Sequence, residues 1–199
     1  MICFTVRGVR VEIHFLFVAV LTLCMLLDET QIAVMGLLAS LMHEAGHVAA
    51  LGLTGCKPRR LAFEISGIAL EQGARAMTVW QELVVLLAGS AVNLVFFGAA
   101  AWLSGSPERA GAFAAVHLVL GIVNLLPLSA LDGGKILRLL LEQVVPLRAA
   151  ERICFVIQIV LLCSVITICA LSLWGGVVNV SLFVFVFYLF SMVLLSQEN

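Results

Sequence analysis

Three long segments without Asp, Glu, Lys or Arg constrain this chain more than any other feature of its sequence. They cover residues 83–107, 110–131 and 153–197. Hydrophobic residues make up 63% of the 199 positions and charged residues 12%, whereas soluble domains are about 45–50% apolar and about 25% charged. A soluble fold of this length cannot bury so much apolar surface, and a membrane helix needs about 20 mainly apolar residues. The sequence therefore predicts an all-α polytopic membrane protein.

Six transmembrane helices are expected, within a single domain that covers residues 1–199. Gly175-Gly176 provides the turn that divides the last apolar segment into two helices. No small-residue cleavage site follows the first apolar run, so a cleaved signal peptide is not expected. The expected spans are residues 13–28, 31–54, 80–103, 111–131, 153–174 and 177–195.

Basic residues lie almost entirely on one side of this six-helix arrangement. Of the eleven Lys and Arg residues, only Arg109 falls on the other side. Because cytoplasmic segments near membrane helices are enriched in Lys and Arg, this bias predicts a multi-pass protein of the cell membrane with both termini in the cytoplasm. The lipid bilayer is then an obligatory partner, and no basic cluster is dense enough to indicate nucleic-acid binding.

The sequence His43-Glu44-Ala45-Gly46-His47 lies inside the second expected span. Two histidines four residues apart stand on one face of a helix and can reach a single metal ion. Glu44 can then act as a general base toward the water that the metal activates. Ionisable groups inside a membrane are costly and indicate a functional site. The pattern therefore predicts a zinc site, with one Zn²⁺ per chain.

A third protein ligand is needed, because a catalytic zinc usually has three and keeps one position open. Asp132 is the leading candidate, since Pro127 ends a helix and Gly133-Gly134 lets the backbone turn so that the carboxylate points into the bundle. The structural alternative is that Asp132 caps the fourth span or begins the next helix. His14, at the start of the first span, and His117, early in the fourth, are weaker metal candidates.

Several polar features have structural interpretations beside their functional ones. Residues 59–71 alternate in the manner of a strand, with Gly67 at a turn, so they form either an interfacial β-hairpin or a sheet edge that pairs with an extended substrate.

Residues 135–152 predict an interfacial amphipathic helix broken near Pro146. Asn93 and Asn124 fit hydrogen bonding between helices. The six cysteines show no CxxC spacing, so neither a disulfide nor a cysteine metal site is expected.

Three segments together resemble the site-2 protease family of intramembrane zinc metalloproteases. They are residues 43–47 (HEAGH), 87–93 (LAGSAVN) and 124–134 (NLLPLSALDGG). Within that family the six-span layout is most similar to the branch that processes sporulation sigma factors. Ser90 stands where the family's second motif commonly has proline, which leaves the local helix geometry open. Neither a PDZ module nor a nucleotide-sensing CBS module is expected.

The resemblance assigns roles to particular residues. It implies that His43, His47 and Asp132 bind zinc, that Glu44 is the catalytic base, and that Asn124 orients substrate or stabilises the oxyanion. The implied activity is hydrolysis of a peptide bond in a membrane-associated or transmembrane protein, with a pro-sigma or anti-sigma factor as one example. A separate regulatory or inhibitory membrane protein is also implied. The alternative is a metal-binding membrane protein without hydrolase activity, either a metal transporter or a partner-binding scaffold.

Overall fold

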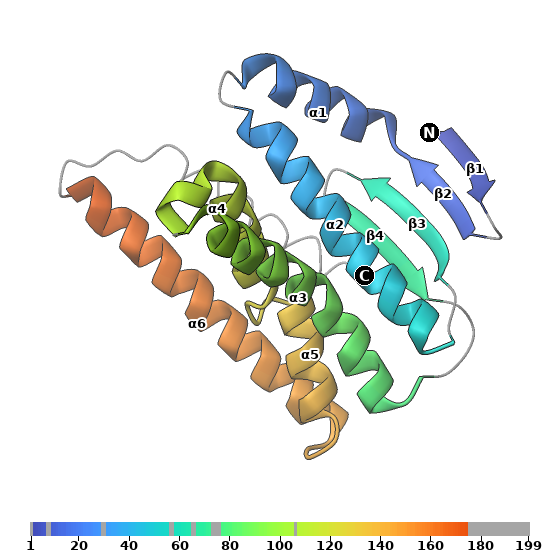
Figure 1. Ribbon diagram of the computed structural model, residues 1–199. Helices are drawn as coiled ribbons and strands as arrows, with labels where there is room; N and C mark the ends of the chain where they lie inside the picture. The colour runs from blue at the N-terminus through green and yellow to red at the C-terminus, as the bar shows by residue number, and fades with distance from the viewer. Residues whose placement is uncertain are drawn as a thin grey trace. The chain divides into compact units, whose positions relative to one another are not determined.

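The computed structural model describes residues 2–6, 9–28, 31–55, 58–64, 67–72, 77–105 and 107–174. The chain forms two compact units, Met1–Asn124 and Leu125–Asn199. Most of the described residues are helical (Figure 1), which confirms the predicted fold class. The prediction of a single domain over residues 1–199 stays a prediction.

A four-stranded sheet in the first unit has the order β1-β2-β3-β4. Its strands are Ile2–Val6, Val9–Ile13, Pro58–Glu64 and Gly67–Gln72. The β1–β2 and β3–β4 pairs are antiparallel, whereas β2 and β3 are parallel. The hairpin predicted near residues 59–71 is therefore confirmed as β3–β4. The hairpin β1–β2 was not predicted, although two five-residue runs rich in β-branched residues flank Arg7-Gly8.

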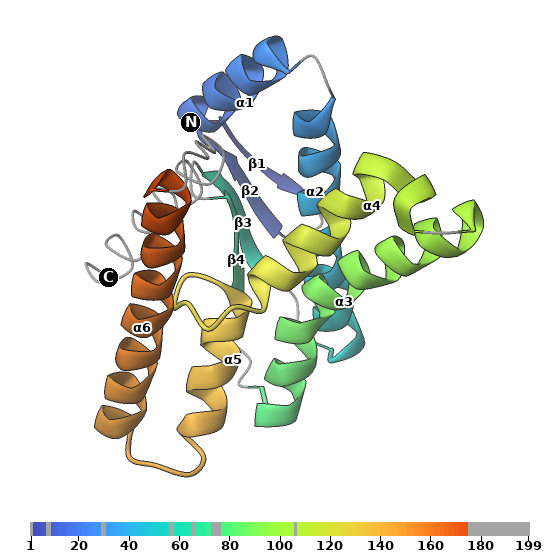
Figure 2. The same cartoon turned by 90° about the vertical axis from the view of Figure 1, so that its left-hand side faces the viewer.

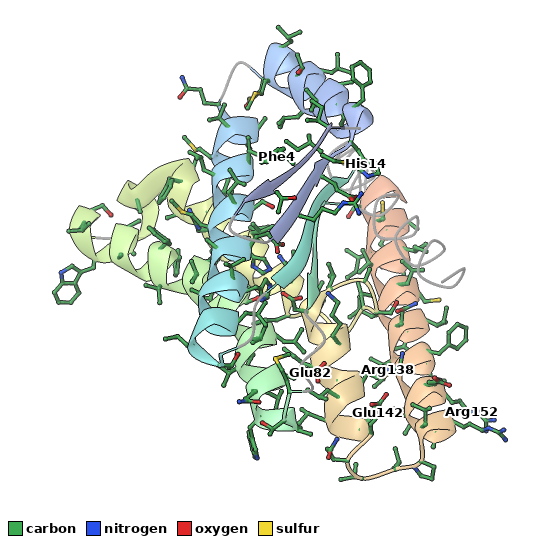
Figure 3. The ribbon with its side chains drawn as sticks, turned by 90° about the vertical axis from the view of Figure 1, so that its right-hand side faces the viewer. Phe4, His14, Glu82, Arg138, Glu142 and Arg152 are labelled. Carbon is green, nitrogen blue, oxygen red and sulfur yellow. The ribbon has the colours of Figure 1, made fainter. Side chains whose placement is uncertain are left out.

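Two helices connect the parallel strands β2 and β3, because such strands need a long crossover. The first is α1, Phe15–Leu27, which begins directly after His14 (Figure 3). The second is α2, Ile32–Leu53. Asp28 separates them, and its carboxylate accepts a 2.6 Å hydrogen bond from the backbone amide of Ala33 in the first turn of α2. Helix α1 thus ends one residue before the boundary expected at residue 28. With 13 residues, α1 is shorter than the roughly 20 residues that cross a bilayer.

Helix α3, Val79–Ser104, is the longest helix of the first unit. A capping box fixes its start, since Thr78 and Gln81 each accept a hydrogen bond from the other's backbone amide. Gly105 ends it in the left-handed conformation, with φ of 78°. Trp80 and Trp102, near the two ends, are 77% and 85% exposed.

Helix α4, Pro107–Asn124, completes the first unit and is kinked at Gly111, where φ is 65°. The span expected over residues 111–131 ends early, at Asn124, because Pro127 cannot continue a helix and disfavours helical backbone just before it. Helices α2, α3 and α4 pack against one another (Figure 2). A core cluster of Ala50, Leu51 and Val85 lies between α2 and α3.

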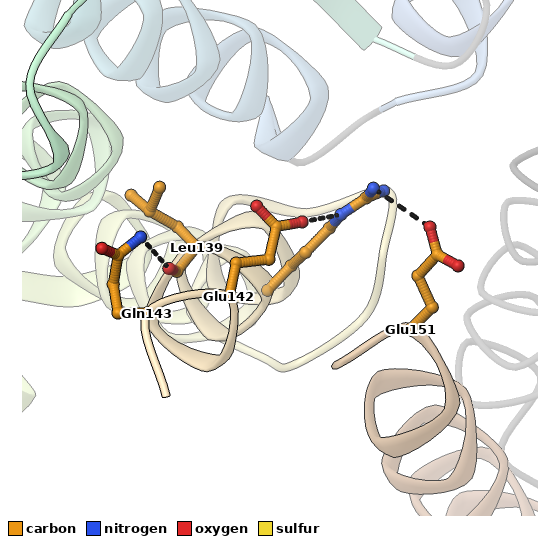
Figure 4. Close-up of polar contacts among 5 residues, drawn as sticks. Leu139, Glu142, Gln143 and Glu151 are labelled. Carbon is orange, nitrogen blue, oxygen red and sulfur yellow. Dashed lines mark hydrogen bonds and ion pairs between the residues drawn. The ribbon is translucent and has the colours of Figure 1, made fainter. Parts of the chain in front are cut away.

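The second unit contains α5, Asp132–Leu141, and α6, Leu147–Trp174. The break predicted near Pro146 is confirmed, since α6 begins at the next residue. Arg138 links the two helices through its guanidinium, which lies 2.7 Å from Glu142 and 3.3 Å from Glu151 (Figure 4). The hydrogen bond to Glu142 raises the pKa of Arg138 above its usual value.

Three helices within the described residues are long and apolar enough to cross a membrane. They are Ile32–Leu53, Val79–Ser104 and Leu147–Ser172, and Ala110–Asn124 is a shorter apolar helix. The span expected at residues 177–195 lies outside the described residues. The count of six transmembrane helices therefore stays a prediction.

Candidate metal centre

His43 and His47 converge on one buried point of α2. Their side chains stand one helical turn apart, and the residues are 4% and 6% exposed. The two Nε2 atoms lie 3.1 Å apart, with the rings nearly perpendicular. Glu44 is half-buried, and one ligand atom from each of His43, Glu44 and His47 lies within 4.8 Å of the others. The structure thus confirms the convergence that the HExxH spacing predicts.

Helix α3 orients both imidazoles from the opposite side. The Nδ1–H of His47 donates a 2.7 Å hydrogen bond to the backbone carbonyl of Val85. This bond holds the proton on Nδ1, so Nε2 of His47 carries the lone pair that would bind a metal. The side-chain amide of Asn93 lies 3.4 Å from Nδ1 of His43. Asn93 therefore bonds between helices, as predicted.

Two glycines allow α2 and α3 to approach closely at this point. A Cβ on Gly89 would lie 2.5 Å from Nε2 of His47 and 2.7 Å from Nε2 of His43. A Cβ on Gly46 would lie 2.7 Å from the carbonyl oxygen of Ala88. Only glycine fits either position without displacement. Gly89 was not singled out from the sequence, although an isolated glycine in a helix often has a packing reason.

The donor set fits zinc. Two imidazole nitrogens, each about 2.0–2.1 Å from a tetrahedral zinc, lie roughly 3.3 Å apart. The observed separation of 3.1 Å is close to this value. Imidazole is also a ligand that suits zinc, so His43 and His47 supply two well-placed donors.

Asp132 is the first residue of α5 and is buried. The structure therefore agrees with the interpretation that it begins a helix, where the helix dipole favours a carboxylate. Its Oδ1 lies 3.6 Å from Nζ of Lys135. A Cβ on Gly133 or on Gly134 would overlap the carbonyl of Leu125 or of Leu128, respectively. Asp132 lies in the second unit, and its role as third zinc ligand stays a prediction.

The segment that leads into Asp132 is held by a buried side chain of α6. The Oε1 atom of Gln158 accepts a 2.9 Å hydrogen bond from the backbone amide of Ser129. Gln158 is almost fully buried. This residue was not identified from the sequence, because nothing in the local pattern of α6 predicts a long-range bond to residues 125–131.

Asn124, His14 and His117 are the remaining polar candidates from the sequence. Asn124 ends α4 and donates from Nδ2 to the carbonyl of Leu120, so its bond lies within α4 rather than between helices. His14 directly precedes α1. His117 is buried on α4, where its Nδ1 lies 3.0 Å from Oδ1 of Asn93. Among the described residues, the group that could hold a metal ion consists of His43, Glu44 and His47, and it includes neither His14 nor His117.

The chain is similar to known proteins in part of its sequence and in its fold. Residues 100–168 match the model of Peptidase family M50, about a third of the chain. The structure is similar to that of the Site-2 Protease from Methanocaldococcus jannaschii, with a TM-score of 0.69 and 20% sequence identity over 96% of this chain and 93% of that chain. At this identity the likeness shows the fold. The curated proteins contain no match to the chain.

The family match and the site's geometry come from different parts of the sequence. Residues 100–168 include the segment 124–134 but exclude His43, Glu44 and His47. The histidine pair is therefore an observation independent of the family match. Together with the apolar helices, these findings support a membrane-embedded metalloprotease.

Proposed function

We propose that this protein is an intramembrane zinc metalloendopeptidase that cleaves a membrane-associated or transmembrane protein. The observation that carries the proposal is the pair of Nε2 atoms 3.1 Å apart on α2, with Glu44 beside them. The same helix is long and apolar enough to cross a membrane. Ionisable side chains such as these are costly to place in the hydrocarbon of a membrane, and a functional role explains them best.

We propose that His43, His47 and Asp132 hold one zinc ion per chain. Two neutral imidazoles and a carboxylate are one of the donor sets found in catalytic zinc sites, which leave a further position open. When bound there, zinc lowers the pKa of a water to about 7 and polarises a carbonyl oxygen. The buried carboxylate of Asp132 and its place in the segment 124–134 support this assignment.

Glu44 is proposed to move the proton during hydrolysis. Its carboxylate takes a proton from the attacking water and gives it to the nitrogen of the leaving amine, so the residue ends the cycle in its starting state. Asn124 is proposed to orient the substrate or stabilise the oxyanion. Its side-chain amide has two hydrogens, and one donates to Leu120, so the second is available for this role.

An extended substrate segment is proposed to pair with the edge of the sheet. A helical substrate must unwind before cleavage, because its peptide groups are bonded within the helix. Strand β4 is an outer strand of the described sheet and also contacts α2. Adding a strand at that edge would hold the peptide backbone through main-chain hydrogen bonds near the helix that carries His43 and His47.

The substrate class and setting are proposed from the sequence. We propose a multi-pass protein of the cell membrane, with six spans and both termini in the cytoplasm, because the basic residues show this bias. A pro-sigma or anti-sigma factor is the proposed type of substrate, from the resemblance to the sporulation branch. A separate membrane protein is proposed to regulate or inhibit the enzyme.

Substitution of Glu44 by Gln tests the proposal. We expect Glu44→Gln to abolish cleavage while zinc, measured by mass spectrometry of the purified protein, stays at one ion per chain. Glu142→Gln, an exposed change directly after α5, is the matched control and should cleave normally. Comparing the membrane proteins that accumulate uncleaved in Glu44→Gln and Glu142→Gln cells identifies the substrate.

Each other result points to a different class of protein. Cleavage that persists in Glu44→Gln excludes the proposed mechanism. Zinc binding without any protein that accumulates uncleaved favours the metal-binding scaffold. Movement of zinc across sealed vesicles by the purified protein favours the transporter.

A further inference from the structure

One glutamine of α6 is bonded to the turn that leads into Asp132. Gln158 is 3% exposed, whereas its neighbours Ile159 and Val160 are 37% and 59% exposed. No charged residue follows it in α6, which is long and apolar enough to cross a membrane. A buried polar side chain in such a helix is costly unless it is hydrogen-bonded. Oε1 of Gln158 accepts the 2.9 Å bond from the backbone amide of Ser129, and only the oxygen end of the side chain can do so.

The peptide group that Gln158 holds also packs against the first turn of α5. A Cβ on Gly134 would overlap the carbonyl of Leu128 and would lie 2.8 Å from the backbone nitrogen of Ser129. Leu128 itself is 1% exposed. The peptide group between Leu128 and Ser129 is therefore enclosed, with α5 in contact on one side and its N–H bonded to α6.

The same peptide group is linked to Asp132 in two ways. Asp132 and Gly134 belong to the first turn of α5. The carbonyl of Leu128 also accepts a 2.8 Å hydrogen bond from the backbone amide of Leu131, the residue before Asp132. A close-packed interior transmits displacements, so a shift of the peptide group between residues 128 and 129 moves the start of α5. Asp132 moves with it.

We propose that Gln158 is a positioning residue that fixes the place of the Asp132 carboxylate and thereby sets the affinity of the chain for zinc. The proposal rests on the proposed function, in which Asp132 is a zinc ligand. Ligand distances in a zinc site vary by only about 0.2 Å, so a turn that relaxes lowers the affinity even when every ligand is present. Gln158 acts through the backbone of residues 128–134.

The zinc affinity of the purified full-length protein, measured by competition with a chelator, tests the proposal. We expect Gln158→Leu to weaken zinc binding roughly 3- to 10-fold, the range that one hydrogen bond supports. Gln158→Glu keeps an acceptor oxygen in the same place, so it should restore binding to within about twofold of the wild type. If Gln158→Leu binds zinc as tightly as the wild type, the proposal is wrong.

Leu162→Val is the control for a general loss of stability. Leu162 lies one turn further along α6 and is 5% exposed. The substitution removes one buried methylene, which costs about as much stability as one hydrogen bond. Its zinc affinity should stay within about twofold of the wild type. If Leu162→Val weakens zinc binding as much as Gln158→Leu does, the effect comes from stability alone and the proposal is overturned.

Asp132→Ala separates this proposal from the metal site on which it rests. We expect Asp132→Ala to weaken zinc binding more than Gln158→Leu does. The double variant should bind zinc no more weakly than Asp132→Ala, because Gln158 acts through Asp132 and the two effects cannot add. A further loss in the double variant contradicts the role of Gln158 alone. If the wild type binds no zinc, or Asp132→Ala binds it as tightly as the wild type, the proposed metal site fails as well.

Discussion

His43 and His47 are oriented by a neighbouring helix, whereas Asp132 is oriented by the chain segment that directly precedes it. The histidines bond to the carbonyl of Val85 and the amide of Asn93, both on α3. Asp132 follows a turn that packs against Gly133 and Gly134 through backbone carbonyls. The histidine site therefore depends on helix packing and side-chain bonds, and the aspartate depends on main-chain geometry. Substitutions should affect the two differently.

The largest effect is expected at the turn before α5. In Gly133→Ala, the new Cβ would overlap the carbonyl of Leu125, and backbone cannot move aside as a side chain can. We expect a loss of about 3 kcal/mol in the free energy of unfolding, at the upper end for overpacking. Unfolding of the purified protein in mixed micelles measures it. Gly36→Ala on α2 is the control, since nothing lies within 4 Å of its Cβ.

A smaller loss of stability, with a specific loss of zinc, is expected at Gly89. The Cβ of Gly89→Ala meets imidazole nitrogens, which can shift at a cost of about 2 kcal/mol. Because the two Nε2 atoms then separate, zinc affinity should fall at least tenfold in chelator competition. Gly98→Ala, on the same helix with open space at its Cβ, should bind zinc normally. Normal zinc affinity in Gly89→Ala would show that this close contact does not shape the site.

Gln158→Leu should weaken the turn moderately. It removes the acceptor for the backbone amide of Ser129, and the lost hydrogen bond is worth about 1 kcal/mol. The same unfolding measurement applies. Gln143→Leu, an exposed change on the surface after α5, should stay within about 0.5 kcal/mol. Equal stabilities for the two variants would mean that Gln158 does not hold residues 125–131.

The smallest effect is expected for the surface ion pairs of Arg138. Its pair with Glu142 is exposed and spaced i,i+4, which is typical of a coupling energy of about 0.3–0.5 kcal/mol. A double-mutant cycle with Arg138→Ala and Glu142→Ala measures the coupling. It should decrease further at high salt, because exposed charges are screened. A coupling above about 1 kcal/mol would contradict the expectation that this exposed pair contributes little.

The parts of the fold that follow from local sequence were predictable. The helices over residues 32–53 and 79–104 agree closely with the expected spans, because their long apolar runs have few alternatives. The HExxH spacing predicted the convergence of His43 and His47, since four residues make about one helical turn. The predicted end of this span, residue 131, was wrong by seven residues, because α4 ends at Asn124. Composition favours a longer span there, but Pro127 imposes the break.

Features that depend on contacts between distant residues could not be predicted. The close approach at Gly89 and the bond from Ser129 to Gln158 appear only when the helices are packed. His117 was weighed as a metal ligand, yet in the structure it contacts Asn93 and two phenyl rings. A sequence shows that a polar residue is buried in a helix, but it does not show which of several partners on other helices satisfies it.

The exposed tryptophans of α3 predict how deep the histidine site lies in a bilayer. At 1.5 Å per residue, Trp80 and Trp102 are about 33 Å apart along the helix, close to the thickness of the hydrocarbon layer, and tryptophan favours its two boundaries. Gly89, which contacts both imidazoles, is then roughly 13 Å from the boundary at Trp80. Water has less than half of the bilayer to cross when it enters from that side. The position of Gly89 along α3, nearer Trp80 than Trp102, thus predicts that water reaches the site from the Trp80 side.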